Sequence, residues 1–101
     1  MATYSADRAE PLEFVTPKDP SDVVVYRFDF SQELETGETI VSRTVTVDTG
    51  LTKDSDDING DYIDVTLSSG TAGRRYEVLC QVGTSASRTL NVTGIVKVAD
   101  R

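Results

Sequence analysis

The sequence predicts an all-β fold, an immunoglobulin/fibronectin-III-like antiparallel β-sandwich of about seven strands. Short segments of alternating apolar and polar residues are separated by turn residues, and no helical period persists for more than a few residues. In addition, Tyr76 opens a strand directly after a turn bracketed by Gly70 and Gly73. A tyrosine at the start of the penultimate strand can turn its hydroxyl onto the preceding backbone, forming a tyrosine corner. We expect Tyr76 to fix the chain where it crosses between sheets.

Alternation of apolar and polar residues predicts the strands in order along the chain. The expected strands are residues 23–30, 40–47, 62–67, 75–82 and 88–98, with a possible first strand at 12–15. The expected core faces are Val24, Tyr26, Phe28 and Phe30; Val41, Val45 and Val47; Ile63, Val65 and Leu67; Tyr76, Val78, Cys80 and Val82; and Leu90, Val92, Val96 and Val98. Each strand should therefore bury one face and expose the other.

Polar and glycine-rich segments predict the connections. Residues 31–39, 48–50 and 83–87 are expected to be turns, with Leu51 returning to the core. Residues 53–61, KDSDDINGD, are expected to form an acidic loop. Gly94 is expected to mark a bulge or a close approach within the last strand.

The chain is long enough for one sandwich domain, expected at residues 17–101, after an N-terminal arm at 1–16 that includes the possible first strand. Residues 1–10 are polar and show no period. Such an arm is either a disordered terminus or a segment that becomes ordered on a neighbouring subunit.

Composition excludes several classes of function. A net charge of −7 argues against a nucleic-acid partner, because phosphate binding needs a cationic face. The absence of histidine removes the commonest general base and zinc ligand. Cys80 has no partner for an internal disulfide and is expected to be a buried, unreactive thiol. We see neither a secretory signal nor an apolar run of membrane-spanning length, and expect a protein of the reducing cytoplasm with no membrane partner.

One group of residues has the chemistry of a metal site. Closely spaced Asp and Asn oxygens suit calcium, and the candidates are Asp54, Asp56, Asp57, Asn59 and Asp61. The EF-hand spacing fails, because aligning Gly60 puts Ser55 at the first ligand position and Thr66 where a bidentate Glu belongs. A solvated turn explains the cluster better, so we assign no metal, cofactor-binding or catalytic residue.

Two arginines form the second candidate. Arg74 and Arg75 precede Tyr76 and could hold a carboxylate or phosphate in bidentate fashion. An exposed pair that offsets the surrounding acid is the simpler interpretation. Serine and threonine are abundant, but no histidine or activating lysine motif makes any of them a nucleophile. We therefore expect a binding or structural protein and no enzyme.

Three motifs follow one another along the chain: PKDPSDVVVYRFDFS, GETIVSRTVTVDTGLT and VTLSSGTAGRRYEVLCQVGTSASRT, which together cover about residues 17–98. They resemble the motifs of the fiber-tail adaptor (Gp77-like) structural proteins of tailed bacteriophages. The second is similar to the family's Gly-[Asp/Glu]-Thr-Ile element, and the third to its Gly-Gly-Thr-Ala-Gly…Tyr and Gly-Arg-Thr elements. Ser69 and Ser87 stand at turn positions where the family usually has glycine.

The resemblance implies a virion structural component of the tail or neck, made in the host cytoplasm, which joins tail and fiber proteins through protein–protein contacts. It also implies a homo-oligomer in the particle and carries no catalytic residue. The alternative is an immunoglobulin-like recognition module for carbohydrate or protein. Sugar binding usually needs exposed aromatic rings, and only Tyr4 and Tyr62 are expected to be exposed.

Overall fold

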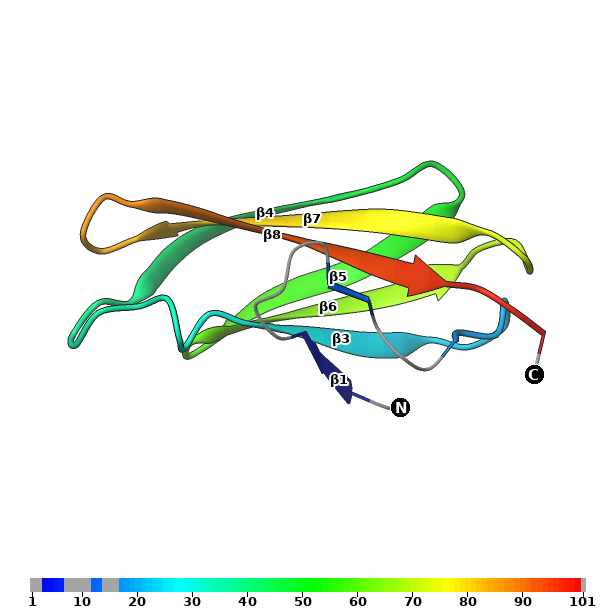
Figure 1. Ribbon diagram of the computed structural model, residues 1–101, viewed down its shortest axis with the longest axis horizontal. Coiled ribbons are helices and arrows are strands. Elements are labelled where there is room, and N and C mark those ends of the chain that lie inside the picture. The colour runs from blue at the N-terminus through cyan, green and yellow to red at the C-terminus, as the bar shows by residue number, and fades with distance from the viewer. Residues whose placement is uncertain (1–2, 7–11, 14–16, 101) are drawn as a thin grey trace.

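The computed structural model describes residues 3–6, 12–13 and 17–100, which form two facing β-sheets without a helix (Figure 1). Sheet A has the strand order β1-β3-β6-β5 and sheet B the order β2-β8-β7-β4. The strands are β1 (Thr3–Ala6), β2 (Leu12–Glu13), β3 (Val24–Asp29), β4 (Ile40–Val47), β5 (Leu51–Asn59), β6 (Tyr62–Ser69), β7 (Arg75–Thr84) and β8 (Thr89–Lys97). The predicted all-β architecture of two layers is confirmed.

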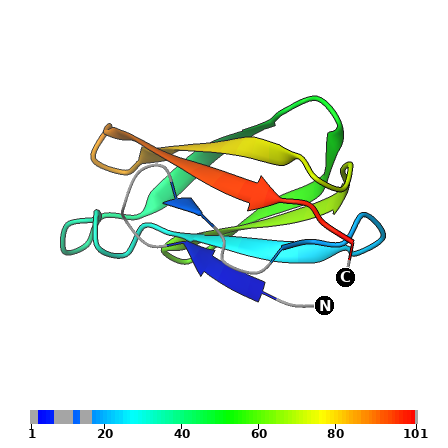
Figure 2. The ribbon, with the colours of Figure 1, turned by 45° about the vertical axis from the view of Figure 1, so that its right-hand side comes forward.

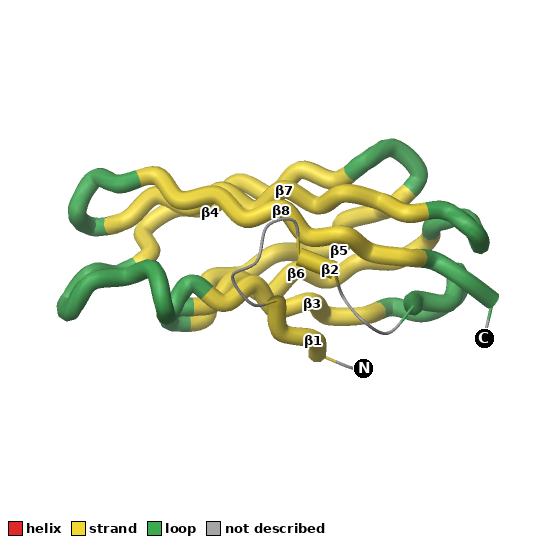
Figure 3. Tube along the Cα trace, in the orientation of Figure 1, coloured by secondary structure: helices red, strands yellow, loops and turns green. Residues whose placement is uncertain are grey.

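Each sheet consists of three long antiparallel strands and one short strand that pairs in parallel at an edge. The short strands are β1, which lies beside β3, and β2, which lies beside β8. Figures 2 and 3 show the long strands stacked as two layers, with the N-terminal strands on one side. The described residues thus contain eight strands, where about seven were expected.

The core is a single layer of side chains between the two sheets. Period-two alternation places apolar residues on the inner faces. The buried residues with the least exposure are Tyr26, Phe28, Phe30, Ile63, Val65 and Leu67 from sheet A, and Val78, Cys80, Val82, Val92, Val96 and Val98 from sheet B. The predicted inner faces of 23–30, 62–67 and 75–82 are confirmed.

The expectation for residues 53–61 was wrong, because most of this segment forms strand β5 and not a loop. Most residues of this strand are charged or polar, and apolar alternation therefore did not predict it. Val41 was also assigned to the wrong face and is 60% exposed, since a register shift between Ile40 and Ser42 puts Ile40 in the core instead. The β7–β8 register runs without a shift through Gly94, so the predicted bulge is absent there.

The N-terminal region differs from the expectation in one respect. Thr3–Ala6 forms strand β1, although residues 1–10 show no strand period. The possible strand at 12–15 corresponds to β2 at Leu12–Glu13, and residues 14–15 lie outside the described part of the chain.

The tyrosine corner is present at the end of the sandwich where the β4–β5 and β6–β7 turns lie. The backbone N–H of Thr71 donates to the Tyr76 hydroxyl oxygen at 2.8 Å. Hydrogen bonding by the Thr71 side chain, and then by its backbone, lowers the pKa of Tyr76. The ring also packs on the β4–β5 turn, where a Cβ on Gly50 would lie 3.1 Å from Tyr76 Cε1. Nearby, the Glu77 N–H donates to the Asp48 carboxylate at 2.8 Å. One side chain therefore holds two turns together.

Removing the Tyr76 hydroxyl tests the corner. We expect Tyr76→Phe to leave the Thr71 N–H without this acceptor and to lower Tm by roughly 4–8 °C in a domain of this size. The matched control is Tyr62→Phe, which removes a hydroxyl from the outer face of sheet A. Thermal unfolding followed by circular dichroism would contradict the corner's role if both variants melted with the wild type.

The two non-glycine residues with positive φ in the described chain are Ser69, at 68°, and Ser87, at 62°. These are the two turn positions where the resembled family usually has glycine. Left-handed backbone costs an L-residue about 1–2 kcal/mol, whereas glycine adopts it freely. The backbone thus keeps the turn conformation, and each serine carries a conformational strain that glycine would not have at the same position.

Restoring glycine should therefore stabilise the fold. We expect Ser69→Gly and Ser87→Gly each to raise the free energy of unfolding by about 0.5–1 kcal/mol, after subtracting the entropy that glycine adds to the unfolded chain. Ser68→Gly, at a strand position without positive φ, should instead destabilise by a similar amount. Urea unfolding measures all three, and stabilisation by Ser68→Gly alone would refute the assignment of strain.

Candidate functional site

The acidic residues proposed as calcium ligands do not converge. Four of the five candidates lie along β5, where a register shift leaves Asp54 between Lys53 and Ser55, and Asp61 lies in the β5–β6 turn. Asp56 is paired opposite the buried Val65, and Asp57 opposite Asp64. Within the described ranges no group of three or more acidic, cysteine or histidine side chains is arranged to hold a metal ion. The structure therefore supplies no geometry for the calcium hypothesis.

Asp56 instead belongs to a charged cluster that closes one open side of the sandwich. Its carboxylate accepts from Arg43 Nε at 2.7 Å and from Lys53 Nζ at 2.6 Å. Hydrogen bonding by Lys53, and then by Arg43, lowers the pKa of Asp56. Because Arg43 lies on β4 and the other two on β5, the cluster joins sheet B to sheet A along their edge strands.

The β4 and β5 edges combine two features that oppose further strand pairing. Each strand has a register shift, between Ile40 and Ser42 in β4 and between Lys53 and Ser55 in β5. Each also carries charged residues on the side that faces the core. Bulges and inward charges are the usual means by which natural sheets prevent edge-to-edge association. We call this the guarded edge.

The opposite side of the sandwich is covered by the N-terminal strands. β1 pairs with Val25–Phe28 of β3, and β2 pairs with Gly94 and Ile95 of β8. Lys18 then fastens the chain to the sandwich. Its backbone N–H donates to Lys97 O at 2.8 Å, and its O accepts from Ala99 N at 2.9 Å.

The Lys18 side chain is buried and reaches the β6–β7 turn. Nζ donates to Ser69 O at 2.6 Å and to Asp19 O at 2.8 Å. Burial lowers the pKa of Lys18, against the opposing effect of Asp22 and other carboxylates. The Lys18 side chain thus links the segment that follows the N-terminal strands, through hydrogen bonds, to the same end of the sandwich as the tyrosine corner.

Arg74 and Arg75 do not form a clamp. Both are exposed, and Arg75 lies opposite Lys97 in the β7–β8 pairing, which places two cations next to each other. The predicted burial of Cys80 is confirmed, and burial raises the pKa of its thiol to about 12. A thiol that stays protonated at neutral pH is a poor nucleophile.

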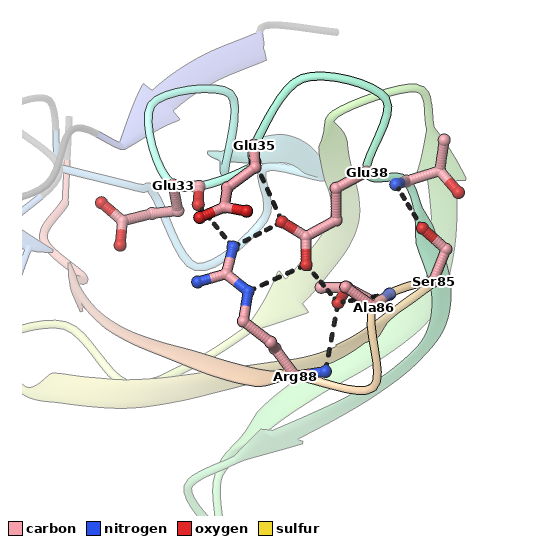
Figure 4. A network of polar contacts seen from close by, with 8 residues as sticks. Glu33, Glu35, Glu38, Ser85, Ala86 and Arg88 are labelled. Atoms are coloured by element: carbon pink, nitrogen blue, oxygen red, sulfur yellow. Dashed lines mark hydrogen bonds and ion pairs between the residues drawn. The ribbon is translucent and has the colours of Figure 1, made fainter.

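A polar network closes the other end of the sandwich (Figure 4). Glu38, in the β3–β4 loop, lies against Arg88 at the start of β8. Its carboxylate accepts from Arg88 Nε at 2.9 Å and also from Arg88 Nη2 and Thr84 Oγ1. The Glu35 N–H donates to the same carboxylate at 2.9 Å. The Glu38 side chain is only 3% exposed, and its carboxylate therefore has its lone pairs occupied by donors.

The network extends through backbone groups of both connections. Arg88 Nη2 donates to Glu33 O at 2.8 Å. Ser85 N donates to Thr39 O at 2.8 Å, and Thr39 N donates to Ser85 Oγ at 3.0 Å. Two loops about fifty residues apart in sequence are consequently held as one rigid surface.

Donors from Arg88, from the Glu35 backbone and from Thr84 lower the pKa of Glu38 to about 2. We did not single out Glu38 and Arg88 from the sequence. A signal was present, because Glu38 occupies the acidic position of the Gly-[Asp/Glu]-Thr-Ile motif and Arg88 the arginine of Gly-Arg-Thr. The ion pair supplies a physical reason for both motifs.

Among the described side chains, the outer face of sheet A presents no free aromatic ring, and the side chain of Tyr4 on β1 lies outside the described part of the chain. The Arg27 guanidinium lies 4.4 Å from the centre of the Tyr62 ring and makes a bidentate contact with Asp64 at 2.8 and 3.0 Å. Tyr62 is half-buried beneath it. Tyr26, Phe28 and Phe30 are in the core, which removes the rings that sugar stacking would need in this part of the chain.

Comparison with known proteins identifies the family. A family model described as "Podophage GP4 fiber-tail adaptor protein gp77" matches residues 18–97. The chain belongs to this fiber-tail adaptor family. The match begins at Lys18 and spans β3 to β8, and so it includes Tyr76 together with Glu38 and Arg88. The family resemblance drawn from the three motifs is confirmed.

Other comparisons add little to the assignment of this fiber-tail adaptor. Among solved structures, the chain is similar to the cysteine protease inhibitor EhICP2 from Entamoeba histolytica, with 14% identity and a TM-score of 0.41 over 95% of this chain and 96% of that one. A likeness at this level carries no argument. Among curated proteins no relative matches. In the described residues, no helix is long and apolar enough to cross a membrane.

The Glu38–Arg88 pair predicts a specific pH dependence. Because folding depresses the pKa of Glu38, its stabilising effect is present above its ordinary value near 4.5 and is lost as the pH falls towards about 2. We expect Glu38→Gln to be less stable than the wild type at pH 7, with the difference shrinking across this window. Urea unfolding at a series of pH values measures it.

Glu35→Gln is the matched control, because Glu35 lies in the same loop and its side chain is exposed. It should change stability little at any pH. A gap between wild type and Glu38→Gln that stayed constant from pH 7 down to pH 2.5 would contradict the linkage.

Proposed function

We propose that this protein is a non-enzymatic structural component of the virion that joins tail and fiber proteins through protein–protein contacts at the tail or neck. It is made in the host cytoplasm and is present in several copies in the particle. The observation that carries the proposal is the family match over residues 18–97, which spans all six long strands. The net charge of −7 is compatible with protein partners and unfavourable for nucleic acid.

We further propose that the sandwich is of the immunoglobulin/fibronectin-III-like type, with an arm at residues 1–16 and the domain at 17–101. Support comes from the strand order, because β1-β3-β6-β5 facing β4-β7-β8 follows the A-B-E-D and C-F-G arrangement of a constant-type domain. The tyrosine corner at Tyr76 lies at the start of β7, which corresponds to strand F. The parallel pairing of β1 with β3 is a departure from that pattern.

An adaptor needs surfaces of fixed shape, and the two closed ends of this sandwich provide them. The Glu38–Arg88 network holds the β3–β4 and β7–β8 connections in one arrangement before any partner binds. Ordering of loops at the moment of binding costs affinity, and a preorganised surface avoids that cost.

We assign the contacts of the adaptor with other virion proteins to the arm at residues 1–16 and to an exposed strand edge. The guarded edge along β4 and β5 is unsuited to strand addition. The β3 and β8 edges have regular register with their neighbours and already accept short parallel strands from the arm. Pairing by an added strand is a common mode of protein recognition, which favours the arm side of the sandwich as the assembly surface.

Deletion of residues 1–16 tests this assignment. We expect the shortened chain to fold, as judged by its circular dichroism spectrum, because the family match begins at Lys18. It should fail to enter particles, as judged by immunoblotting of purified virions. An arm of the same length made of Gly and Ser serves as the control for spacing alone. Normal incorporation of the shortened chain would refute the role of the arm.

Electron microscopy of particles labelled with an antibody tests the adaptor function itself. Label at the junction of tail and fibers is expected, and label on the capsid or none on the particle would refute it. A recognition module for carbohydrate is disfavoured by the placement of Tyr62 under Arg27. Binding on a glycan array would reverse that preference.

A further inference from the structure

The outer face of sheet B has a central region without charged residues. Where β4, β7 and β8 pair, the outward positions form three rows across the strands. The rows are Ser42, Gly83 and Thr89; Thr44, Gln81 and Asn91; and Thr46, Leu79 and Thr93. None of these nine residues is charged, although 27% of the whole sequence is. We call these nine residues the neutral face.

The equivalent region of sheet A is very different. The outward rows across β3, β6 and β5 are Val25, Thr66 and Ser55; Arg27, Asp64 and Asp57; and Asp29, Tyr62 and Asn59. Four of these nine residues are charged, and three of the four are acidic. The absence of charge therefore distinguishes these three rows from the matching rows of sheet A, and on sheet B it ends at the next row, where Glu77 faces outward.

Two apolar side chains are exposed at opposite ends of the neutral face. Leu79, in the row of Thr46 and Thr93, is 40% exposed, and Val41, at the β4 register shift next to Ser42, is 60% exposed. The β7–β8 register is uninterrupted, and at Gly83 a Cβ would lie 2.5 Å from Ser42 Oγ, so the face is closely packed there. Depletion of charge at a surface that retains apolar side chains is the compositional signature of the core of a protein interface.

We propose that the neutral face packs against the same face of a second copy of this chain. The argument is electrostatic. Each copy carries a net charge of −7, so contacts between copies through most surfaces bring carboxylates together. Packing the neutral face on the outer face of another copy's sheet A would bury Asp29, Asp57 or the Arg27–Asp64 ion pair against side chains that bear no charge. Of the pairings between these two sheet faces, only neutral face against neutral face avoids burying charged groups.

The area of the neutral face limits the affinity that we expect between two copies. Three strands and three rows span roughly 300 Å² from ordinary strand spacings, which is less than the area per partner in a stable complex. The pair should therefore be weak in solution, with a Kd of about 10–100 µM. In a particle, where other contacts hold the copies close together, such a contact is sufficient. The inference rests on the multi-copy arrangement in the proposed function and names the surface that the copies share.

Sedimentation velocity of the full chain between about 1 and 500 µM, a range that brackets the expected Kd, tests the proposal. We expect a monomer–dimer equilibrium that tightens as NaCl rises from about 0.05 to 0.5 M, because salt screens repulsion between acidic copies. Leu79→Glu should weaken the dimer at least about 100-fold, since an isologous contact places both introduced carboxylates in the interface. Thr44→Glu on the neighbouring strand should do the same, in case Leu79→Glu disturbs folding.

Thr66→Glu is the matched control, because it adds the same charge at an outward position of the central strand of sheet A. It should leave the dimer intact. A wild type that stays monomeric throughout, or a dimer that survives both neutral-face variants, would overturn the proposal. Loss of association in Thr66→Glu alone would overturn it too. Virion immunoblots separate this inference from the function: a monomeric chain found in tails refutes the neutral-face contact only, whereas absence from tails refutes the adaptor role.

Discussion

The fold depends on one constraint: its core is a single layer of side chains between two sheets, and such a layer has four borders that backbone pairing alone does not close. Three of the borders are closed by polar side chains, and the fourth is covered by the short N-terminal strands. The Tyr76 hydroxyl holds two turns at one end, and the Glu38–Arg88 pair holds two loops at the other. Along the sides, Arg43, Lys53 and Asp56 form the guarded edge, and the N-terminal strands cover the remaining edges. The apolar layer gives the sandwich its cohesion, and the borders define its shape.

This arrangement gives physical meaning to the sequence motifs of the fiber-tail adaptor family. Tyr76 and the turn before it form one border, and the acidic residue of the Gly-[Asp/Glu]-Thr-Ile element with the arginine of the Gly-Arg-Thr element forms the opposite border. Where this chain replaces glycine by Ser69 and Ser87, the backbone keeps the left-handed conformation that glycine would adopt without strain. The motif residues described above therefore have a structural role, which is to hold the connections together at the two ends of the sandwich.

Sequence alternation predicted the parts of the fold in which a strand has one apolar and one polar face. It succeeded for the segments around Phe28, Val65 and Val78, and the position of Tyr76 predicted the corner. It failed at β4 and β5, because bulges shift the alternation and charged residues occupy inward positions. It also missed the Glu38–Arg88 pair, since fifty residues separate the partners. It missed β1, whose pairing is decided by tertiary contact and not by its own pattern.

The guarded edge affects how subunits that are not yet bound to other proteins aggregate. Two long strands at the rim of a sandwich would ordinarily be able to template the growth of cross-β fibrils. The bulges and the charged residues at inward positions along β4 and β5 make that rim a poor template. The same residues that contribute modestly to folding thus keep a crowded pool of free subunits competent for assembly.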